Sequence, residues 1–391
     1  MIPERVLTDS LIENMISRME SQEDEDKIFM SIRDTLINEG LIHNFATSTE
    51  MSSIRYCSID GARINSLTQG MDNIFLSAAT MHDGFFTLSS AAEDIPHILS
   101  SSIEPYNKVN DKSNEAIMML SEMGICGSLP HYDIRAMDGA YPTALITLMR
   151  TLSDYEYEQI APVIDFIMGD HSEEIFKGIN ELLNPPQEEG KYIIGLSKSD
   201  STKDFLEIYK DLVDADLSAV VFGDKNLASR VLRPGEMFAP ITKNLGSLLR
   251  TQARTLVTGI EDSNGPDNYK DLVHSLYESV NKNSLNNRVY TTYFCPSENS
   301  KMGRVHRIDF SLPEGTTVLD EDRILEHADK TIQVVNRDIV SVEYNEPYAQ
   351  YKVDEECKKI VSRSKKNASD YVRMKMKDNH LSQNLTQNYR T

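Results

Sequence analysis

The chain has 391 residues, of which 40% are hydrophobic and 26% are charged, a balance typical of a globular protein with a sizeable core. No apolar run approaches the roughly 18–20 residues needed to cross a bilayer, and the N-terminus lacks a basic-then-apolar signal pattern, so we expect a cytoplasmic protein with no membrane contact. The net charge of −21 argues against nucleic-acid binding by the chain as a whole, because phosphate binding needs Lys and Arg.

The first predicted elements are helices followed by strands. Residues 1–50 have apolar positions at helical spacing and form an N-terminal helical segment, which we expect to contact another subunit or a partner. A strand-rich block around turn residues follows over residues 54–90. Next come a helix, a strand and a helix over residues 111–125, 132–139 and 141–152.

The second half of the chain continues the alternation. Residues 153–184 predict a helical hairpin that is broken near Gly169, inside the polar turn "GDHSEE". The elements after it are a strand over 191–198, a helix over 201–213, a strand over 217–224, a hairpin over 288–312, and helices over 319–340 and 350–378. This order predicts the α/β class, with a mixed sheet covered by helices. We divide the chain into the N-terminal segment 1–50, an α/β domain over 51–362, and a basic helix with a mobile tail over 363–391.

Two common kinds of site are not expected. The four cysteines are scattered, with no CxxC and no paired spacing, which excludes a zinc ribbon and argues against a disulfide framework. We expect them to be buried or incidental thiols. The chain also lacks a Gly-x-x-x-x-Gly-Lys-Ser/Thr loop, so ATP hydrolysis by P-loop chemistry is not expected.

Acidic residues follow two of the predicted strands. Asp60 in "SIDGA" and Asp138 in "AMDGA" each come after an apolar run and before a glycine, and Glu115 lies in the first turn of the predicted helix between them. Asp-Gly is a favoured turn pair, so two surface turns are one explanation. The other is an oxygen-only site, because Mg²⁺ and Mn²⁺ prefer such ligands. The spacing alone leaves both explanations open.

The order of the motifs resembles that of the NurA nuclease family. The family's strand ending in Asp-Gly-Ser, its helix glutamate and its strand ending in Asp-Gly are matched by "SIDGA", "NEAIMMLSEM" and "IRAMDGAYP". Further family segments are matched in order by "YIIGLSKSDSTKDF", "FGDKNLASRVLRPGEMFAPI", "GRVHRIDFSLP" and "NEPYAQYKVDEECKKI". The resemblance covers roughly residues 50–360, and each motif is short, so its specificity comes from the order.

This resemblance implies an RNase H-like fold and a nuclease that cuts DNA with one or two Mn²⁺ or Mg²⁺ ions. The implied catalytic and metal-binding residues are Asp60, Glu115, Asp138 and Asp354, with Glu355 or Glu356 as substitutes for the last. The resemblance also implies a homodimer that docks on a hexameric HerA-type ATPase translocase. Such pairs act in DNA-end processing and repair or in anti-phage defence, and the sequence does not choose between these roles.

The chain departs from the family at two motifs. The serine of Asp-Gly-Ser is Ala62, and the tyrosine before the last Pro is Glu346, with Tyr344 and Tyr348 nearby. These departures and the acidic balance motivate an alternative function, a catalytically weak DNA-binding or scaffold subunit that regulates a motor.

Basic residues near the motifs are candidate DNA contacts. Lys198 matches the family's Gly-x-Ser-Lys motif, although a solvated loop lysine is the alternative. Arg304 and Arg307 would line a DNA channel, although a half-exposed edge strand produces the same pattern. Lys358 and Lys359 open the basic segment 357–377, which would guide DNA towards the metals or form a solvated helix face.

Overall fold

The computed structural model describes most of the chain, in two compact units. The described residues are 27–46, 54–68, 71–82, 97–105, 110–140, 143–154, 156–183, 191–197, 202–212, 223–243, 249, 251, 253–258, 266–283, 289–297, 305–312, 320–339 and 346–375. Unit 1 comprises Met1–Thr47, Ser199–Ile241 and Thr292–Arg307, and unit 2 comprises Ser48–Lys198, Thr242–Thr291 and Ile308–Thr391.

A mixed sheet forms the centre of unit 2. Its strands are, in order, β6 (Tyr192–Ser197), β5 (Ile134–Asp138), β2 (Tyr56–Thr68), β3 (Met71–His82) and β4 (His97–Pro105). β2, β5 and β6 are parallel to one another, whereas β3 is antiparallel to both β2 and β4. β10 (His306–Ser311) lies next to β6, and β9 (Val289–Phe294) lies next to β10. The predicted mixed sheet is therefore confirmed.

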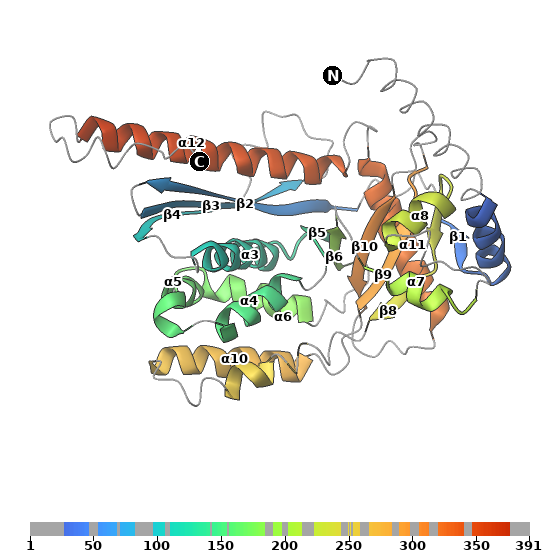
Figure 1. Ribbon diagram of the computed structural model, residues 1–391, viewed down its shortest axis with the longest axis horizontal. Helices are drawn as coiled ribbons and strands as arrows, with labels where there is room; N and C mark the ends of the chain where they lie inside the picture. The colour runs from blue at the N-terminus through green and yellow to red at the C-terminus, as the bar shows by residue number, and fades with distance from the viewer. Residues whose placement is uncertain are drawn as a thin grey trace, which may run out of the picture. The chain divides into compact units, whose positions relative to one another are not determined.

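Helices cover both faces of this sheet (Figure 1). α12 (Tyr348–Lys375) packs on one face, over β2 and β3, and α3 (Asn110–Ser128) packs on the other. α4 (Thr143–Asp154), α5 (Tyr157–Ile167) and α6 (Ser172–Leu183) form a layer beneath α3, and α10 (Asp267–Asn283) lies beyond them. α11 (Glu321–Asp338) precedes α12 in the chain. The predicted helical hairpin is confirmed as α5 and α6, and its break includes Gly169.

Alternate residues of β2 distinguish the two faces of the sheet. Cys57 and Ile59 are buried in the large core cluster that includes α3. Ala62 packs instead with Val353 and Cys357 of α12. Successive side chains of a strand point to opposite faces, so the even-numbered residues of this part of β2 face α12. The odd-numbered residues face α3.

Two glycines allow α3 and α6 to pack closely. A Cβ atom added at Gly127 would lie 2.4 Å from the carbonyl oxygen of Glu174, and one added at Gly178 would lie 2.0 Å from that of Met123. Any side chain at either position would push the two helices apart.

The centre of unit 1 is an apolar cluster rich in aromatic residues. The helix of residues 27–38 contributes Phe29, Ile32 and Leu36, which pack with α7 (Asp204–Tyr209), α8 (Asp224–Val231) and β7 (Glu236–Phe238). β1 (Ile42–Asn44) is antiparallel to β7, and β8 (Ile241–Lys243) pairs with β9. The described part of the predicted N-terminal segment is thus a component of unit 1, and its role in partner contact stays a prediction.

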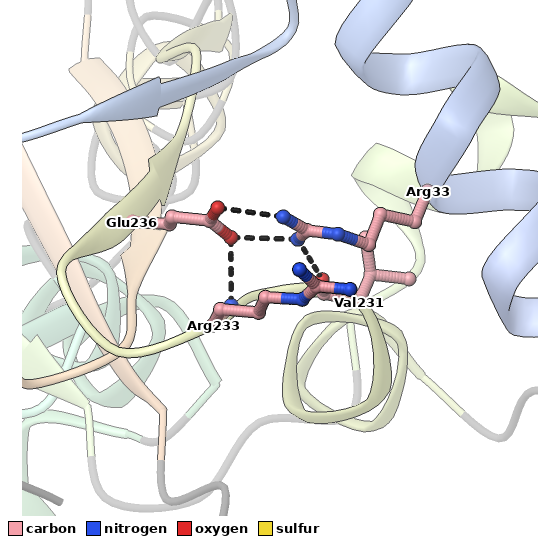
Figure 2. A network of polar contacts seen from close by, with 4 residues as sticks. All are labelled: Arg33, Val231, Arg233 and Glu236. Atoms are coloured by element: carbon pink, nitrogen blue, oxygen red, sulfur yellow. Dashed lines mark hydrogen bonds and ion pairs between the residues drawn. The ribbon is translucent and has the colours of Figure 1, made fainter. Parts of the chain in front are cut away.

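A buried ion pair fixes the helix of residues 27–38 to β7 (Figure 2). Arg33 donates through Nη1 and Nη2 to the two carboxylate oxygens of Glu236, both at 2.6 Å, and through Nη1 to the carbonyl oxygen of Val231 at 2.6 Å. The backbone N–H of Arg233 donates to Glu236 at 2.7 Å. Glu236 belongs to the Pro-Gly-Glu motif, so this motif has a structural role in unit 1.

Some elements were not predicted or lie outside the described residues. α10, β4 and β7 were not expected from the sequence, whereas the strand expected over 217–224 is described only at residues 223–224. All four cysteines are buried thiols, as expected. Among the helices that the structure describes, none combines the length and apolarity that a membrane crossing needs.

Candidate active site

Asp60 and Asp138 lie at matching positions on two adjacent parallel strands. β2 pairs with β5 in a register that runs from Tyr56 with Ile134 to Ile59 with Met137, and the two aspartates follow directly on the last pair. Neighbouring strands are about 4.8 Å apart, and residues paired in register point to the same face. Ile59 and Met137 are both in the core cluster on the α3 side. Asp60 and Asp138 therefore both face the side that α12 covers.

The two Asp-Gly pairs differ in conformation, which corrects one prediction. β5 ends at Asp138, and Gly139 adopts φ +93° while its N–H donates to the carbonyl oxygen of Leu196 at 2.8 Å. This is the predicted turn. The prediction that a strand also ends at Asp60 is wrong, because β2 continues to Thr68 and stays paired with β3 throughout. What ends at this point is the neighbouring strand β5.

Asp60 is held firmly although it lies within a strand. Its residue is only 4% exposed, and its Oδ1 accepts the backbone N–H of Gly61 at 2.8 Å. Its carbonyl oxygen accepts the Sγ–H of Cys357 at 3.2 Å, a contact between residues 297 positions apart. α12 is thereby fixed directly over the aspartate.

The contact from Cys357 brings Asp354 to the same face, since the two residues are about one turn apart on α12. The side chain of Asp354 is 19% exposed, and its Oδ2 accepts a hydrogen bond from Nζ of Lys358 at 2.6 Å. The predicted ligand and the predicted DNA contact are therefore partners in one ion pair.

Glu115 lies on α3, on the opposite face of the sheet. Its neighbours Ala116 and Ile117 pack into the core cluster beneath β2. Its carboxylate accepts from Nζ of Lys112 at 2.8 Å, and this hydrogen bond raises the pKa of the lysine. The structure does not bring Glu115 together with Asp60.

The fit of a divalent cation can be judged from the carboxylates present. Asp60 and Asp138 offer oxygen ligands of the hard type that Mg²⁺ and Mn²⁺ prefer, on neighbouring strands and one face. Asp354 lies on the helix that covers that face. Within the described part of the chain, however, no three His, Cys, Asp or Glu side chains are close enough to hold a metal ion. The pair of aspartates fits a cation, and a complete set of ligands requires Asp354 or another donor to approach it.

The candidate DNA-binding arginines and Lys198 receive little support. Lys198 and Arg304 lie outside the described residues. Arg307 is only 5% exposed, and β10 lies between β9 and β6, so the expectation of a half-exposed edge strand is wrong. All six residues of β10 are buried, so the exposure of Arg307 gives no support to a basic channel lining, and its role in DNA binding stays a prediction.

Lys358 and Lys359 have acidic partners on α12 itself. Lys358 is 67% exposed and pairs with Asp354, while Lys359 contacts Glu355 at 3.1 Å and Glu356 at 2.9 Å. Both glutamates that could replace Asp354 as a ligand are therefore paired with Lys359. Much of the positive charge predicted at this point is neutralised locally.

Two acidic residues support the site or the fold in ways that the motifs did not reveal. Asp338, at the end of α11, accepts the backbone N–H of Ala349 at 2.8 Å and so fixes the start of α12. Asp224, in the matched "FGDKNLAS" segment, is fully buried and accepts from Thr202 and from the N–H of Leu206. Asp338 falls inside the helix predicted over 319–340, so no sequence signal indicated its contact with the start of α12.

The two departures from the family pattern have different outcomes. Ala62 is buried against α12, so an apolar contact takes the place of the family's hydroxyl. Tyr344 lies outside the described residues, and Tyr348 begins α12, with Nζ of Lys352 at 5.8 Å from its ring centre. Which residue fills the family's tyrosine position stays open.

The fold matches solved structures of NurA nucleases. The NurA nuclease from Sulfolobus solfataricus has a TM-score of 0.51 and 12% identity, and the match covers 96% of this chain and 98% of that one. A structure of NurA with manganese has a TM-score of 0.48, 11% identity and coverages of 92% and 98%. NurA bound to dAMP and manganese has a TM-score of 0.39, 11% identity and coverages of 83% and 90%. No protein-family model and no curated protein matches the chain. The resemblance expected from the motif order is thus confirmed at the level of the fold.

Proposed function

We propose that the chain is a metal-dependent DNA nuclease that hydrolyses phosphodiester bonds, with an RNase H-like core. The observation that carries the proposal is the register of β2 and β5, which puts Asp60 and Asp138 at matching positions on the face of the sheet where α12 packs over Asp60. The likeness of the fold to the Sulfolobus solfataricus nuclease supports it. At 12% identity that likeness concerns the fold alone, so the chemistry must come from the carboxylates.

In this proposal Asp60 and Asp138 hold one or two Mn²⁺ or Mg²⁺ ions, and Asp354 joins them from α12. Bound ions of this kind lower the pKa of a coordinated water and stabilise the leaving oxygen in phosphodiester cleavage. The chain itself fixes the two strand aspartates by backbone register and excludes water around Asp60 by burial. Glu115 stays a predicted fourth ligand, although α3 packs on the face of the sheet opposite to α12 and the Glu115 carboxylate is paired with Lys112.

The proposed partners are DNA, a second copy of the chain and a HerA-type hexameric ATPase. The chain has no P-loop motif, so movement along DNA would come from such a motor. DNA-end processing and anti-phage defence are both compatible with this arrangement.

One observation favours a second function, a catalytically weak DNA-binding or scaffold subunit that regulates a motor. Among the residues described, no three potential ligands are gathered into a metal site. With Glu115 held by Lys112 and Asp354 held by Lys358, the chain would bind DNA without cutting it efficiently.

The test compares Asp60→Asn and Asp138→Asn with Asp165→Asn, an exposed aspartate on α5 that serves as a matched control. We expect cleavage of a labelled oligonucleotide in Mn²⁺ to fall on the order of 10²-fold or more in the first two variants and to stay unchanged in the control. Mn²⁺ at about 100 times its Kd should stabilise the parent by about 2.7 kcal/mol, and the two site variants should lose this gain.

The outcomes separate the two functions. Parent protein that binds DNA but shows no EDTA-sensitive cleavage would support the regulatory subunit. Full activity in both Asn variants would show that the two aspartates are not the site. In metal-free buffer the Asn variants should melt no lower than the parent, because each removes one of two neighbouring like charges.

A further inference from the structure

The exposed side of α12 changes in charge along its length. Up to Lys359, each lysine on the helix has a carboxylate partner one turn away: Lys352 pairs with Glu355, Lys358 with Asp354, and Lys359 with Glu355 and Glu356. These pairs neutralise the first three turns. They also prevent Lys358 and Lys359 from acting as unopposed cations.

Three basic residues follow without such partners: Arg363, Lys365 and Lys366, here named the α12 basic segment. Arg363 and Lys366 are exposed, Lys365 is half-buried, and none of the three makes an ion pair within the described part of the chain. No carboxylate precedes any of them by three or four positions, where a helix would bring the two side chains together. Asp370 follows Lys366 by four positions, but the two side chains make no ion pair in the described part of the helix.

The α12 basic segment lies at a fixed distance from the proposed site along the helix axis. Val353, Cys357 and Val361 are buried against β2 and hold α12 on the sheet, and Cys357 contacts Asp60 itself. Arg363 and Lys366 are nine and twelve residues beyond Asp354 on the same helix. At 1.5 Å per residue, they lie about 14–18 Å from Asp354 along the helix axis.

We propose that the α12 basic segment binds the phosphate backbone of the DNA substrate about four to five base pairs from the cleavage point, an inference that rests on the proposed nuclease function. The distance follows from the axial rise of about 3.4 Å per base pair. A polyanion is the partner favoured by charge, because the chain carries −21 overall and repels it elsewhere. A cluster of cations that make no ion pair in the described part of the chain, on an otherwise acidic protein, supplies the local attraction that phosphates need.

The experiment compares two variants that lose the same three charges. The test variant is Arg363→Gln, Lys365→Gln and Lys366→Gln. The control is Lys177→Gln, Lys210→Gln and Lys330→Gln, at the exposed Lys177 of α6, the exposed Lys210 directly after α7 and the partly exposed Lys330 of α11. DNA affinity is measured in EDTA by fluorescence anisotropy with a labelled duplex, so binding is recorded without cleavage, and circular dichroism checks that both variants fold.

The test variant should bind DNA more weakly, and its log–log salt slope should become shallower by about 0.9 for each phosphate that the protein no longer neutralises. The control should match the parent in both quantities. In Mn²⁺ the test variant should raise KM and leave kcat unchanged, because Asp60, Asp138 and Asp354 are intact.

The inference fails if the test variant binds DNA like the parent, if the control weakens binding as much, or if poly-glutamate displaces the duplex at equal charge concentration. If the parent protein cleaves DNA and the test variant binds DNA as tightly as the parent, the result contradicts the phosphate contact and leaves the nuclease function supported. If the parent protein binds DNA more tightly than the test variant but cleaves no DNA, the result contradicts the nuclease function and still supports the phosphate contact.

Discussion

Replacing Arg33 by methionine tests whether the N-terminal segment is part of the folded core of unit 1. The side chains of Arg33 and Glu236 are only 6% and 13% exposed, and the substitution removes three hydrogen bonds of 2.6 Å. Glu236 then keeps one donor, the N–H of Arg233. Breaking a buried ion pair by removing one partner typically costs about 3–5 kcal/mol. We expect a loss of that size in the free energy of unfolding.

The pKa of Glu236 predicts how the stability loss of Arg33→Met changes with pH. Burial raises the pKa of Glu236, but the hydrogen bonds and charge of Arg33 and the N–H of Arg233 lower it by more, so the pKa is below its usual value of 4.5. A depressed carboxyl pKa contributes stability above about pH 4.5 that is lost as the pH falls through the folded value. Without Arg33, burial dominates and this contribution disappears. The deficit of Arg33→Met should therefore be largest near neutral pH and shrink in acid.

The assay is urea unfolding followed by circular dichroism, since the chain contains no tryptophan. Glu236→Gln and the double variant complete a cycle, in which we expect the double variant to be less destabilised than the sum of the single ones, by about 0.5–3 kcal/mol. Arg150→Met, at an exposed position of α4, is the control. A cost below about 1 kcal/mol for Arg33→Met, or additive single effects, would refute the role of the pair.

Two further predictions concern unit 2. Burial of His327 between the rings of Tyr192 and Phe310 lowers its pKa to about 3, below the ordinary 6.5, so the unfolded chain binds more protons between these values. Stability should then fall as the pH drops below about 6.5, by at most about 1.4 kcal/mol per pH unit, and His327→Leu should flatten this slope in acid unfolding titrations. Gly178→Ala should destabilise by about 1–3 kcal/mol in thermal unfolding, because its Cβ would lie 2.0 Å from the carbonyl oxygen of Met123, whereas Lys177→Ala beside it should have little effect. A Gly178→Ala variant as stable as the parent would show that α3 and α6 do not pack so closely.

The two Asp-Gly pairs show how far local sequence determines the candidate site. At Asp138 the prediction succeeds because Gly139 supplies the left-handed conformation that ends β5. The same dipeptide at Asp60 continues a strand, because pairing with β3 persists on one side after β5 has ended on the other. That pairing depends on residues that the dipeptide does not contain. The position of the aspartates was predictable, but the conformation at Asp60 was not.

The position of α12 on the sheet also could not be predicted from the local sequence. Helical spacing indicated a helix over residues 350–378, close to the observed Tyr348–Lys375. Its placement over Asp60 depends on contacts such as that of Cys357, whose partner is 297 positions away in the chain. The acidic and basic residues of the helix were predicted as separate sites, a ligand and a DNA contact. Their spacing of four residues instead makes Asp354 and Lys358 an ion pair, as helix geometry favours.

The four proposed ligands therefore differ in how the structure holds them. This difference predicts the order in which they would bind a metal ion. Asp60 and Asp138 belong to strands whose register fixes them side by side. Glu115 and Asp354 belong to helices, and each is bound to a lysine three or four residues away. A cation must compete with Lys112 for Glu115 and with Lys358 for Asp354, whereas the register of β2 and β5 already holds the two strand aspartates on one face of the sheet. Exposed pairs of this kind are worth about 0.3–0.5 kcal/mol, a small barrier beside the affinity of a divalent ion for several carboxylates. The strand aspartates would hold the ion first, and Asp354 would follow once Lys358 turns to solvent or to a phosphate.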